Sequence, residues 1–419
     1  MLSRIKFEIE PLVDQVLDQL PDSVWASTTT TFADLALGGG QFVRAIEQRL
    51  RLYGHSDTNI HSRVWGFEES DLHIRYAVNK HKLVGHYVKM SYEQLLTLED
   101  TMKFSVVVGN PPYQKPGTLQ KDDNLWSEFL ALGIKLVEED TGYLGFVTPA
   151  SWGSLGSNIK NPGSSIRKKI FAQYNIDYVD FSVAKHFTVG STFTSYVINK
   201  RKTPGHLTNI VYGDGTAESV DFDKYVCFPL KYTDRVFVEL FNDFRTHYLA
   251  GSCYPITQAD PYKTIRASMP GKIAAGDYSK TKSVKHSARA YHTNSQDILW
   301  TRPEFTNTFH TQWKVVFSYS GSWKVEVTND CSLTDASMCI LVDTEDQARS
   351  VASVLSSRLI KFLITRVYLW SGYFSGVLLN HIPQLPMTQV YTDTEVEQLI
   401  LTEQQRSIII PYLIDNKKP

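Results

Sequence analysis

The stretch Val106–Tyr113, VVVGNPPY, indicates both a fold and a chemistry. Three valines and Gly109 form a short apolar run that predicts a buried strand. Two prolines then fix φ, donate no backbone N–H and hold Asn110 in an extended conformation. The result is a stiff tip at the carboxyl end of a strand, which is where open α/β sheets bind ligands.

This tip has the groups that methylation of an aromatic amine requires. The Asn110 side-chain oxygen and the Pro111 carbonyl are both able to accept hydrogen bonds from one NH2 group, and neither Pro111 nor Pro112 offers a competing N–H. Tyr113 supplies a flat face for stacking. Two acceptors on an amine localise its lone pair and stabilise the positive charge that develops during transfer. The alternative interpretation is a tight surface turn.

The first half of the chain alternates short apolar runs with helical patterns, which predicts a parallel sheet covered by helices on both faces. We expect helices at Phe42–Leu52, Asp71–Asn79, Trp126–Glu138 and Ser165–Gln173. The expected strands are Phe32–Leu37, Val64–Phe67, Val106–Gly109, Tyr143–Thr148, Tyr178–Phe181 and Thr194–Ile198.

Two further motifs in this half suit a nucleotide-like cofactor. In Asp34–Phe42, DLALGGGQF, the glycines from Gly38 to Gly40 allow a sharp strand-to-helix turn close to a ligand, although a plain structural turn is equally compatible. About 30 residues later, Glu68 and Glu69 follow a second apolar run, where an acid often binds ribose hydroxyls. Taken alone, this acidic pair fits an exposed helix start better.

The order of these motifs resembles that of the gamma-class DNA adenine-N6 amino-methyltransferases, the TaqI-type methylases of restriction-modification systems. GYLGFVTPASW at Gly142–Trp152 and VAKHFTVGSTFTSYVINK at Val183–Lys200 are similar to later motifs of that family. Three positions differ from the sequence pattern of that family. Leu35 and Leu37 interrupt the usual glycine motif, and Ser105 stands before the catalytic strand where the family commonly has Asp.

The resemblance implies a fold, a cofactor and a substrate. The fold is α/β, with a Rossmann-like S-adenosylmethionine-dependent methyltransferase domain and a C-terminal mixed α+β target-recognition domain. The substrate is double-stranded DNA, from which the target base is flipped out. Tyr113 and Phe187 are then the two base-stacking residues, and Glu93 and Glu99 are both candidates for contacting the adenine of the cofactor. The residues assigned to S-adenosylmethionine are Asp34, Gly38, Gly40, Phe42, Glu68, Glu69 and Asn110.

The pattern of alternating strands and helices ends near KRKTPG, Lys200–Gly205, and the residues after it show only weak periodicity. This change predicts a boundary between a catalytic domain at 1–205 and a DNA target-recognition domain at 206–419. Between Lys263 and Arg289 there are seven Lys or Arg and one acid, which suits phosphate contacts or an exposed loop. The candidate DNA-binding residues there are Lys272, Lys280, Lys282, Lys285 and Arg289. Later helices are expected at Ala348–Leu369 and Thr394–Tyr412.

Composition narrows the class of protein. The net charge of −1 confines any DNA-binding surface to a local patch. Four cysteines without a CxxC pair indicate neither a disulfide framework nor a metal site, and no stretch is apolar enough to cross a membrane. We expect a cytoplasmic protein of a bacterium, an archaeon or a phage-infected host, with any restriction endonuclease on a separate chain.

Other functions share the same chemistry. Enzymes that methylate cytosine N4, RNA or a protein glutamine also attack a planar nitrogen, and the NPPY motif does not separate them. The long C-terminal region favours DNA, and Asn at position 110 favours adenine. A non-catalytic DNA-binding protein on the same scaffold is the alternative from a different class.

Overall fold

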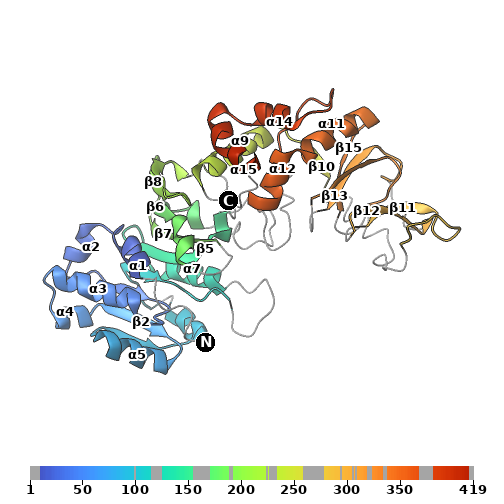
Figure 1. Cartoon of the computed structure of the whole chain (residues 1–419). Helices are drawn as coiled ribbons and strands as arrows, with labels where there is room; N and C mark the ends of the chain where they lie inside the picture. Colours follow the sequence, from blue (N-terminus) through green and yellow to red (C-terminus); the bar gives the residue numbers. More distant parts are fainter. Residues whose placement is uncertain are drawn as a thin grey trace. The chain divides into compact units, whose positions relative to one another are not determined.

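The structure is a computed structural model, and it describes residues 10–98, 101–114, 125–153, 170–187, 192–222, 225, 234–257, 278–292, 295–303, 306, 309–318, 323–333, 337–367 and 381–414. These residues divide into two compact units near residue 226 (Figure 1). Among them, no helix is both long and apolar enough to cross a bilayer.

The first unit is built on a nine-stranded sheet with the order β3-β2-β1-β4-β5-β7-β6-β8-β9. Strands β3, β2, β1, β4 and β5 run parallel, whereas β7 is antiparallel to both of its neighbours. The strand bounds are β1 Phe32–Asp34, β2 Val64–Glu68, β3 His86–Lys89, β4 Val106–Gly109, β5 Tyr143–Pro149, β6 Asn175–Asp180, β7 Phe193–Asn199, β8 Thr208–Val211 and β9 Ala217–Val220.

Helices cover both faces of the parallel part of this sheet. Side chains of α1 (Glu10–Leu17), α3 (Gln41–Leu52) and α5 (Asp71–His81) share one core cluster with Val106 and Val108 of β4. On the opposite face, Gly133 of α7 (Leu125–Leu136) lies against Leu144 and Phe146 of β5. Shorter helices are α2 Asp22–Ala26, α4 Asp57–His61 and α6 Tyr92–Leu95, with 3-10 turns at Leu96–Leu98, Ala150–Gly153 and Ser182–His186.

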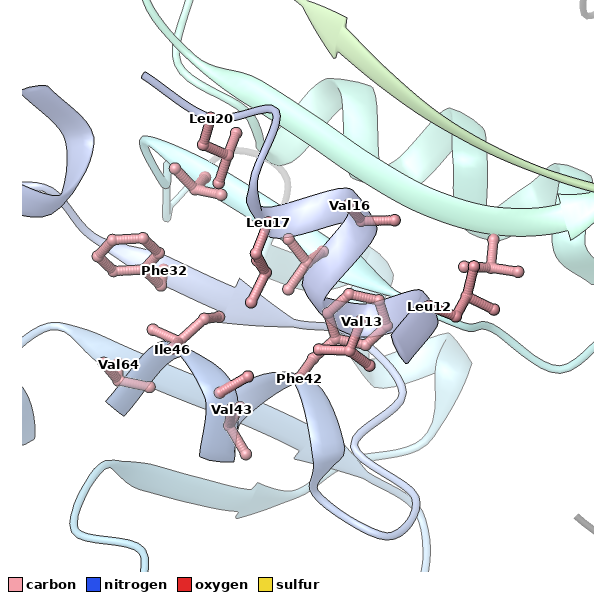
Figure 2. Packing of buried hydrophobic residues seen from close by; sticks show 14 of the residues in the cluster. Leu12, Val13, Val16, Leu17, Leu20, Phe32, Phe42, Val43, Ile46 and Val64 are labelled. Atoms are coloured by element: carbon pink, nitrogen blue, oxygen red, sulfur yellow. The ribbon is translucent and has the colours of Figure 1, made fainter. Parts of the chain in front are cut away.

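The core on the α1 and α3 face is well filled, as Figure 2 shows. Leu12, Val16 and Val43 are fully buried there, and Phe32 of β1 lies against the same group. Burying such side chains stabilises a fold by about 1.5–3 kcal/mol each. This packing holds β1 and the start of α3, and therefore the glycine turn between them, in a fixed position.

The second unit combines a four-stranded sheet, β10-β15-β13-β14, with a two-stranded hairpin of β11 and β12 and several helices. Helix α11 packs on β13 and β14, and α12 contacts α14 and α15. The strands are β10 Ile256–Thr257, β11 Ala288–His292, β12 Asp297–Thr301, β13 Lys314–Ser318, β14 Val325–Thr328 and β15 Ser337–Leu341. The helices are α9 Arg235–Leu249, α11 Glu345–Ser356, α12 Arg358–Phe362, α14 Asp393–Ile400 and α15 Glu403–Ile414, with a short π-helix at Leu363–Val367.

The α/β fold expected from sequence is confirmed, with differences in detail. Each expected strand overlaps an observed one, whereas β3 was not expected because its half-buried residues give a weak pattern. The helix expected at Ala348–Leu369 is interrupted at Ser357, whose side chain caps α12. Two helices, α14 and α15, replace the single one expected at Thr394–Tyr412. Most of the expected helix Ser165–Gln173 lies outside the described residues.

The boundary at residue 205 is wrong for the structure. Residues 208–211 and 217–220 form β8 and β9, and β8 pairs in parallel with β6 and so extends the large sheet. The first unit therefore continues to about residue 226. The turn at Lys200–Gly205 connects two strands of one sheet and does not separate two domains.

Candidate active site

The candidate active site lies where β1 and β4 end side by side in the middle of the sheet. Phe32, Ala33 and Asp34 pair with Val106, Val107 and Val108. The chain that leaves β1 enters α3 on one face, whereas the chain that leaves β4 leads to α7 on the other. This reversal of strand order is a topological switch point, and open α/β sheets bind their ligands there.

The two strand ends approach each other closely. A Cβ added to Gly109 would lie 3.2 Å from the Asp34 Oδ1 atom, a tight contact. Glycine at 109 therefore lets the chain before Asn110 pass directly beside the Asp34 carboxyl group.

Asp34 is a buried acid, with 1% of its surface exposed. Burial raises its pKa from 3.8 to about 7, against the lowering effect of a hydrogen bond donated by the Ala36 N–H, while the nearby Glu68 carboxylate raises it further. The carboxyl group therefore changes charge near neutral pH, and a bound cation would stabilise its ionised form.

The glycine turn between β1 and α3 has the backbone conformation that its sequence predicted. Gly38 and Gly40 have φ of 50° and 79°, in the left-handed region that favours glycine. Gly40 is also the N-cap residue of α3, and a Cβ added to it would lie 2.9 Å from the Ala77 Cβ of α5. The missing side chain therefore serves both the turn and the packing of α3 against α5.

The Glu68 carboxylate already bonds to backbone groups. Its Oε2 accepts a hydrogen bond of 3.0 Å from the Gly38 N–H, and its Oε1 accepts one of 3.1 Å from the Ser70 N–H. His73 Nδ1 also lies 3.2 Å from Oε1. Glu68 thus ties the glycine turn to the end of β2, and its predicted ribose contact stays a prediction.

The other predicted cofactor contacts differ in their surroundings. Glu69 is exposed to solvent beside Glu68. Phe42 is 4% exposed and packs in the core cluster among residues of α1 and α3, as Figure 2 shows. Glu93 is exposed in the first turn of α6, and Glu99 lies outside the described residues.

The Asn110–Tyr113 tip directly follows β4. The Tyr113 hydroxyl donates a hydrogen bond of 2.6 Å to the Asn110 Oδ1 atom. Pro111 is buried, Pro112 is exposed and Tyr113 is half-buried. Burial is also the main reason why the pKa of the Tyr113 hydroxyl is raised, so this group is a neutral donor at physiological pH.

Phe187, the second predicted stacking residue, lies near the same tip. Its ring stacks on Phe193, with centroids 4.0 Å apart and an angle of 19° between the planes. The Tyr113 ring contacts the same Phe193 ring, with centroids 5.1 Å apart. Phe193 was not singled out from the sequence, although the strand expected at Thr194–Ile198 begins directly after it.

The residues around the switch point fit the cofactor that the resemblance implies. S-adenosylmethionine carries a sulfonium and an ammonium group, and Asp34 and Glu68 provide carboxyl groups for cations. The positive φ of Gly38 and Gly40 disfavours a side chain at either position, and a Cβ on Gly40 would also meet Ala77 at 2.9 Å. Within the described parts of the chain, no cluster of three or more His, Cys, Asp or Glu residues is placed to hold a metal ion.

The predicted DNA-binding residues belong to the second unit. Lys282 and Arg289 both lie over the ring of Trp300, with the Lys282 Nζ 5.2 Å and the Arg289 Cζ 5.7 Å from its centroid. Lys280 and Lys285 are exposed on the segment that enters β11. Lys272 lies outside the described residues. The structure therefore gathers two cations of the basic segment on one hairpin.

Fold and site together define the class of protein: an open α/β unit with a mainly parallel sheet and a candidate ligand site at its switch point, together with an additional C-terminal unit. Residues 43–187 match the family model described as Eco57I restriction-modification methylase. This match covers about a third of the chain, from α3 to Phe187, and includes the Asn110–Tyr113 tip. No curated protein matches the sequence.

Solved structures of restriction-modification proteins are similar to the chain at low sequence identity. A modification subunit of a putative type I restriction enzyme from Vibrio vulnificus YJ016 is 13% identical, with a TM-score of 0.41 over 54% of this chain and 58% of that one. The type IIG restriction endonuclease BpuSI is 11% identical, with a TM-score of 0.45 over 97% and 61%. The type IIL enzyme MmeI, solved with DNA, is 12% identical, with a TM-score of 0.45 over 94% and 65%. This chain thus spans less than two thirds of the length of each.

Proposed function

We propose that this protein is a DNA methyltransferase that transfers the methyl group of S-adenosylmethionine to N6 of an adenine flipped out of the duplex. The observation that carries the proposal is the position of Asn110–Tyr113 at the carboxyl end of β4, beside Asp34 and the glycine turn. A hydrogen-bonding tip for an amine and a cradle for a cationic cofactor thereby meet at one switch point.

The tip acts on the target amine. When bound, S-adenosylmethionine supplies an electrophilic methyl group. The Asn110 Oδ1 and the Pro111 carbonyl accept hydrogen bonds from the two amine N–H groups, which directs the nitrogen lone pair toward that methyl group. As the new N–C bond replaces the S–C bond, the amine gives up one proton to solvent. The Asn110 Oδ1 has two lone pairs, so it accepts a hydrogen bond from the amine while it keeps the one that the Tyr113 hydroxyl donates. Tyr113 and Phe187 stack on the flipped base.

The glycine turn and its acids hold the cofactor. Gly38 and Gly40 leave room for its close approach, and Asp34 in its ionised form attracts its positive charge. Asn110 adds a side-chain contact from β4. Glu68 serves either by keeping the Gly38 turn in place or by accepting ribose hydroxyls after its present bonds rearrange.

The second unit is the DNA target-recognition domain, and its β11–β12 hairpin contacts the phosphate backbone. Lys282 and Arg289 lie over the ring of Trp300, which orients both cations, and the Arg289 Nη1 is also 4.0 Å from the Asp330 Oδ2. Lys280 and Lys285 add exposed charge next to them. We further propose that the protein serves a restriction-modification system, in the cytoplasm, with a restriction endonuclease on a separate chain.

A methyl-transfer assay on unmethylated duplex DNA, followed by digestion to nucleosides and mass spectrometry, tests the reaction. We expect N6-methyladenine. N4-methylcytosine would keep the mechanism and change the base. No methylated nucleoside, together with measurable cofactor binding, would overturn the proposal in favour of an RNA or protein substrate or a non-catalytic role.

Replacement of Asn110 by Ala tests the catalytic residue. We expect methyl transfer to fall by at least about 100-fold, because a lost acceptor in the transition state has an effect of that order. Binding of S-adenosylmethionine, measured by calorimetry, should persist. Asn209→Ala, at an exposed position of β8, is the matched control and should retain activity. Near-normal turnover of Asn110→Ala would contradict the mechanism.

The hairpin contact is tested by the salt dependence of DNA binding. Lys282→Ala should lower the slope of log K against log salt concentration by about 1, because one phosphate contact is lost. Lys324→Ala is the matched control, because Lys324 is already paired with Asp297 and Glu326 at 2.8 and 2.9 Å. Equal slopes for wild type and Lys282→Ala would place the DNA elsewhere.

A further inference from the structure

Phe193 contacts both aromatic residues that are predicted to stack on the target base. Its ring is parallel to that of Phe187 to within 19°, with centroids 4.0 Å apart, and it meets the Tyr113 ring at 5.1 Å and 44°. Tyr113 follows β4, whereas Phe187 follows the 3-10 turn Ser182–His186, so that the two come from separate segments. Phe193 is the aromatic ring that joins them.

Phe193 is anchored more firmly than either of its partners. It is the first residue of β7, where it pairs with Pro149 of β5, and it is 3% exposed. It belongs to the buried core cluster, whereas Tyr113 and Phe187 are partly buried residues that pack against that cluster. A ring fixed in a central strand therefore supports two rings that connecting segments carry.

We propose that Phe193 is a positioning residue of the methyl-transfer reaction, which sets the placement of both stacking rings around the target base. This inference rests on the proposed function. Phe193 covers one face of Phe187, so the base meets this ring on its remaining face or edge. On the other side it limits the tilt of Tyr113, whose hydroxyl is held by Asn110. Phe193 itself touches neither base nor cofactor.

Phe193→Leu is the test variant, because it retains most of the apolar volume and removes the ring contacts. We expect KM for DNA to rise roughly two- to tenfold, the range that the loss of aromatic pairing predicts. Binding of S-adenosylmethionine should be unchanged. The fluorescence of 2-aminopurine at the target position, which reports extrusion of the base from the stack, should increase less than with wild type.

Phe181→Leu is the matched control. Phe181 is also buried, with 1% exposed, and its ring packs near that of Trp152, with centroids 6.1 Å apart. We expect it to lower thermal stability to a similar degree while leaving KM for DNA and the 2-aminopurine signal unchanged. If Phe193→Leu does not fold, Phe193→Met, with its flexible side chain, takes its place.

The possible outcomes separate this inference from the proposed function. Absence of DNA methylation by wild type would overturn the proposed function itself. Methylation by wild type, together with a normal KM and 2-aminopurine signal in Phe193→Leu, would overturn only the positioning role. A lower stability with unchanged KM would also overturn it, because a purely structural residue changes the folded fraction and not the affinity for DNA.

Discussion

At the residue scale, the two acids at the switch point have different surroundings, although the sequence suggests both as cofactor ligands. Asp34 is enclosed at the end of β1 and has a raised pKa, whereas Glu68 accepts hydrogen bonds from two backbone N–H groups. Burial without a cation favours the neutral form of an acid such as Asp34. The charge state of Asp34 therefore responds to pH near neutrality and to a cationic ligand.

We predict that Asp34 makes the protein less stable as pH rises toward neutral. Its pKa is about 7 in the folded protein and near 3.8 when unfolded, so the folded state binds the extra proton between these values. Its stabilising effect is complete below pH 3.8 and is lost as pH rises through about 7, with an upper limit of roughly 4 kcal/mol. Urea unfolding of wild type and Asp34→Asn at pH 5 and pH 8 measures it. An equal pH dependence in both proteins would contradict the assignment.

At the element scale, the turn between β1 and α3 shows why glycine is needed at particular positions. Gly40 begins α3 with a left-handed backbone and lies against Ala77 of α5, and the N–H of Gly38 bonds to Glu68. The end of β1, the glycine turn and helices α3 and α5 are therefore in contact at Gly38 and Gly40. The same turn faces the end of β4, so its geometry affects both folding and the predicted cofactor site.

We predict that Gly40→Ala destabilises the first unit more than Gly54→Ala. Both glycines have positive φ, of 79° and 85°, and each substitution costs about 1–2 kcal/mol in backbone strain. Only the Gly40 variant also places its Cβ 2.9 Å from Ala77, whereas Gly54 has open space around it. The clash adds about 1–3 kcal/mol. Chemical denaturation of the two variants compares them, and equal stability would show that α3 and α5 separate without cost.

At the scale of the whole molecule, the chain consists of two units with different architectures. The first is one continuous sheet that includes β8 and β9 beyond the turn at Lys200–Gly205. Arg235, the first residue of α9, belongs to this unit although the rest of that helix belongs to the second, and its Nη2 lies 3.1 Å from the Glu218 Oε2 of β9. The limit of the first unit is therefore set by strand pairing and not by the change in composition near residue 205.

We predict that a fragment of residues 1–235 is more stable than one of residues 1–205. The shorter fragment leaves β6 as an edge strand, paired only with β7, and lacks Ile210 and Tyr212, which are fully buried in the intact protein. Exposed edges favour aggregation, and the two lost side chains each stabilise by about 1.5–3 kcal/mol. Thermal unfolding and size-exclusion chromatography of both fragments measure this. If the 1–205 fragment were equally stable and monomeric, β8 and β9 would be dispensable.

The sequence by itself determined the fold class, most strands of the sheet and the tip at Asn110. The reason is that short-range patterns indicate buried strands, glycines indicate a left-handed backbone, and consecutive prolines indicate a rigid turn. Only the tertiary structure showed that Glu68 accepts a hydrogen bond from the Gly38 N–H and that Phe42 is buried in the core. It also showed that Phe193 contacts both Tyr113 and Phe187. It also decided that β8 and β9 join the first unit. These features depend on which distant segments pack together, and the physical reason is that pairing between strands and rings far apart in the chain leaves no periodic signal in the local sequence.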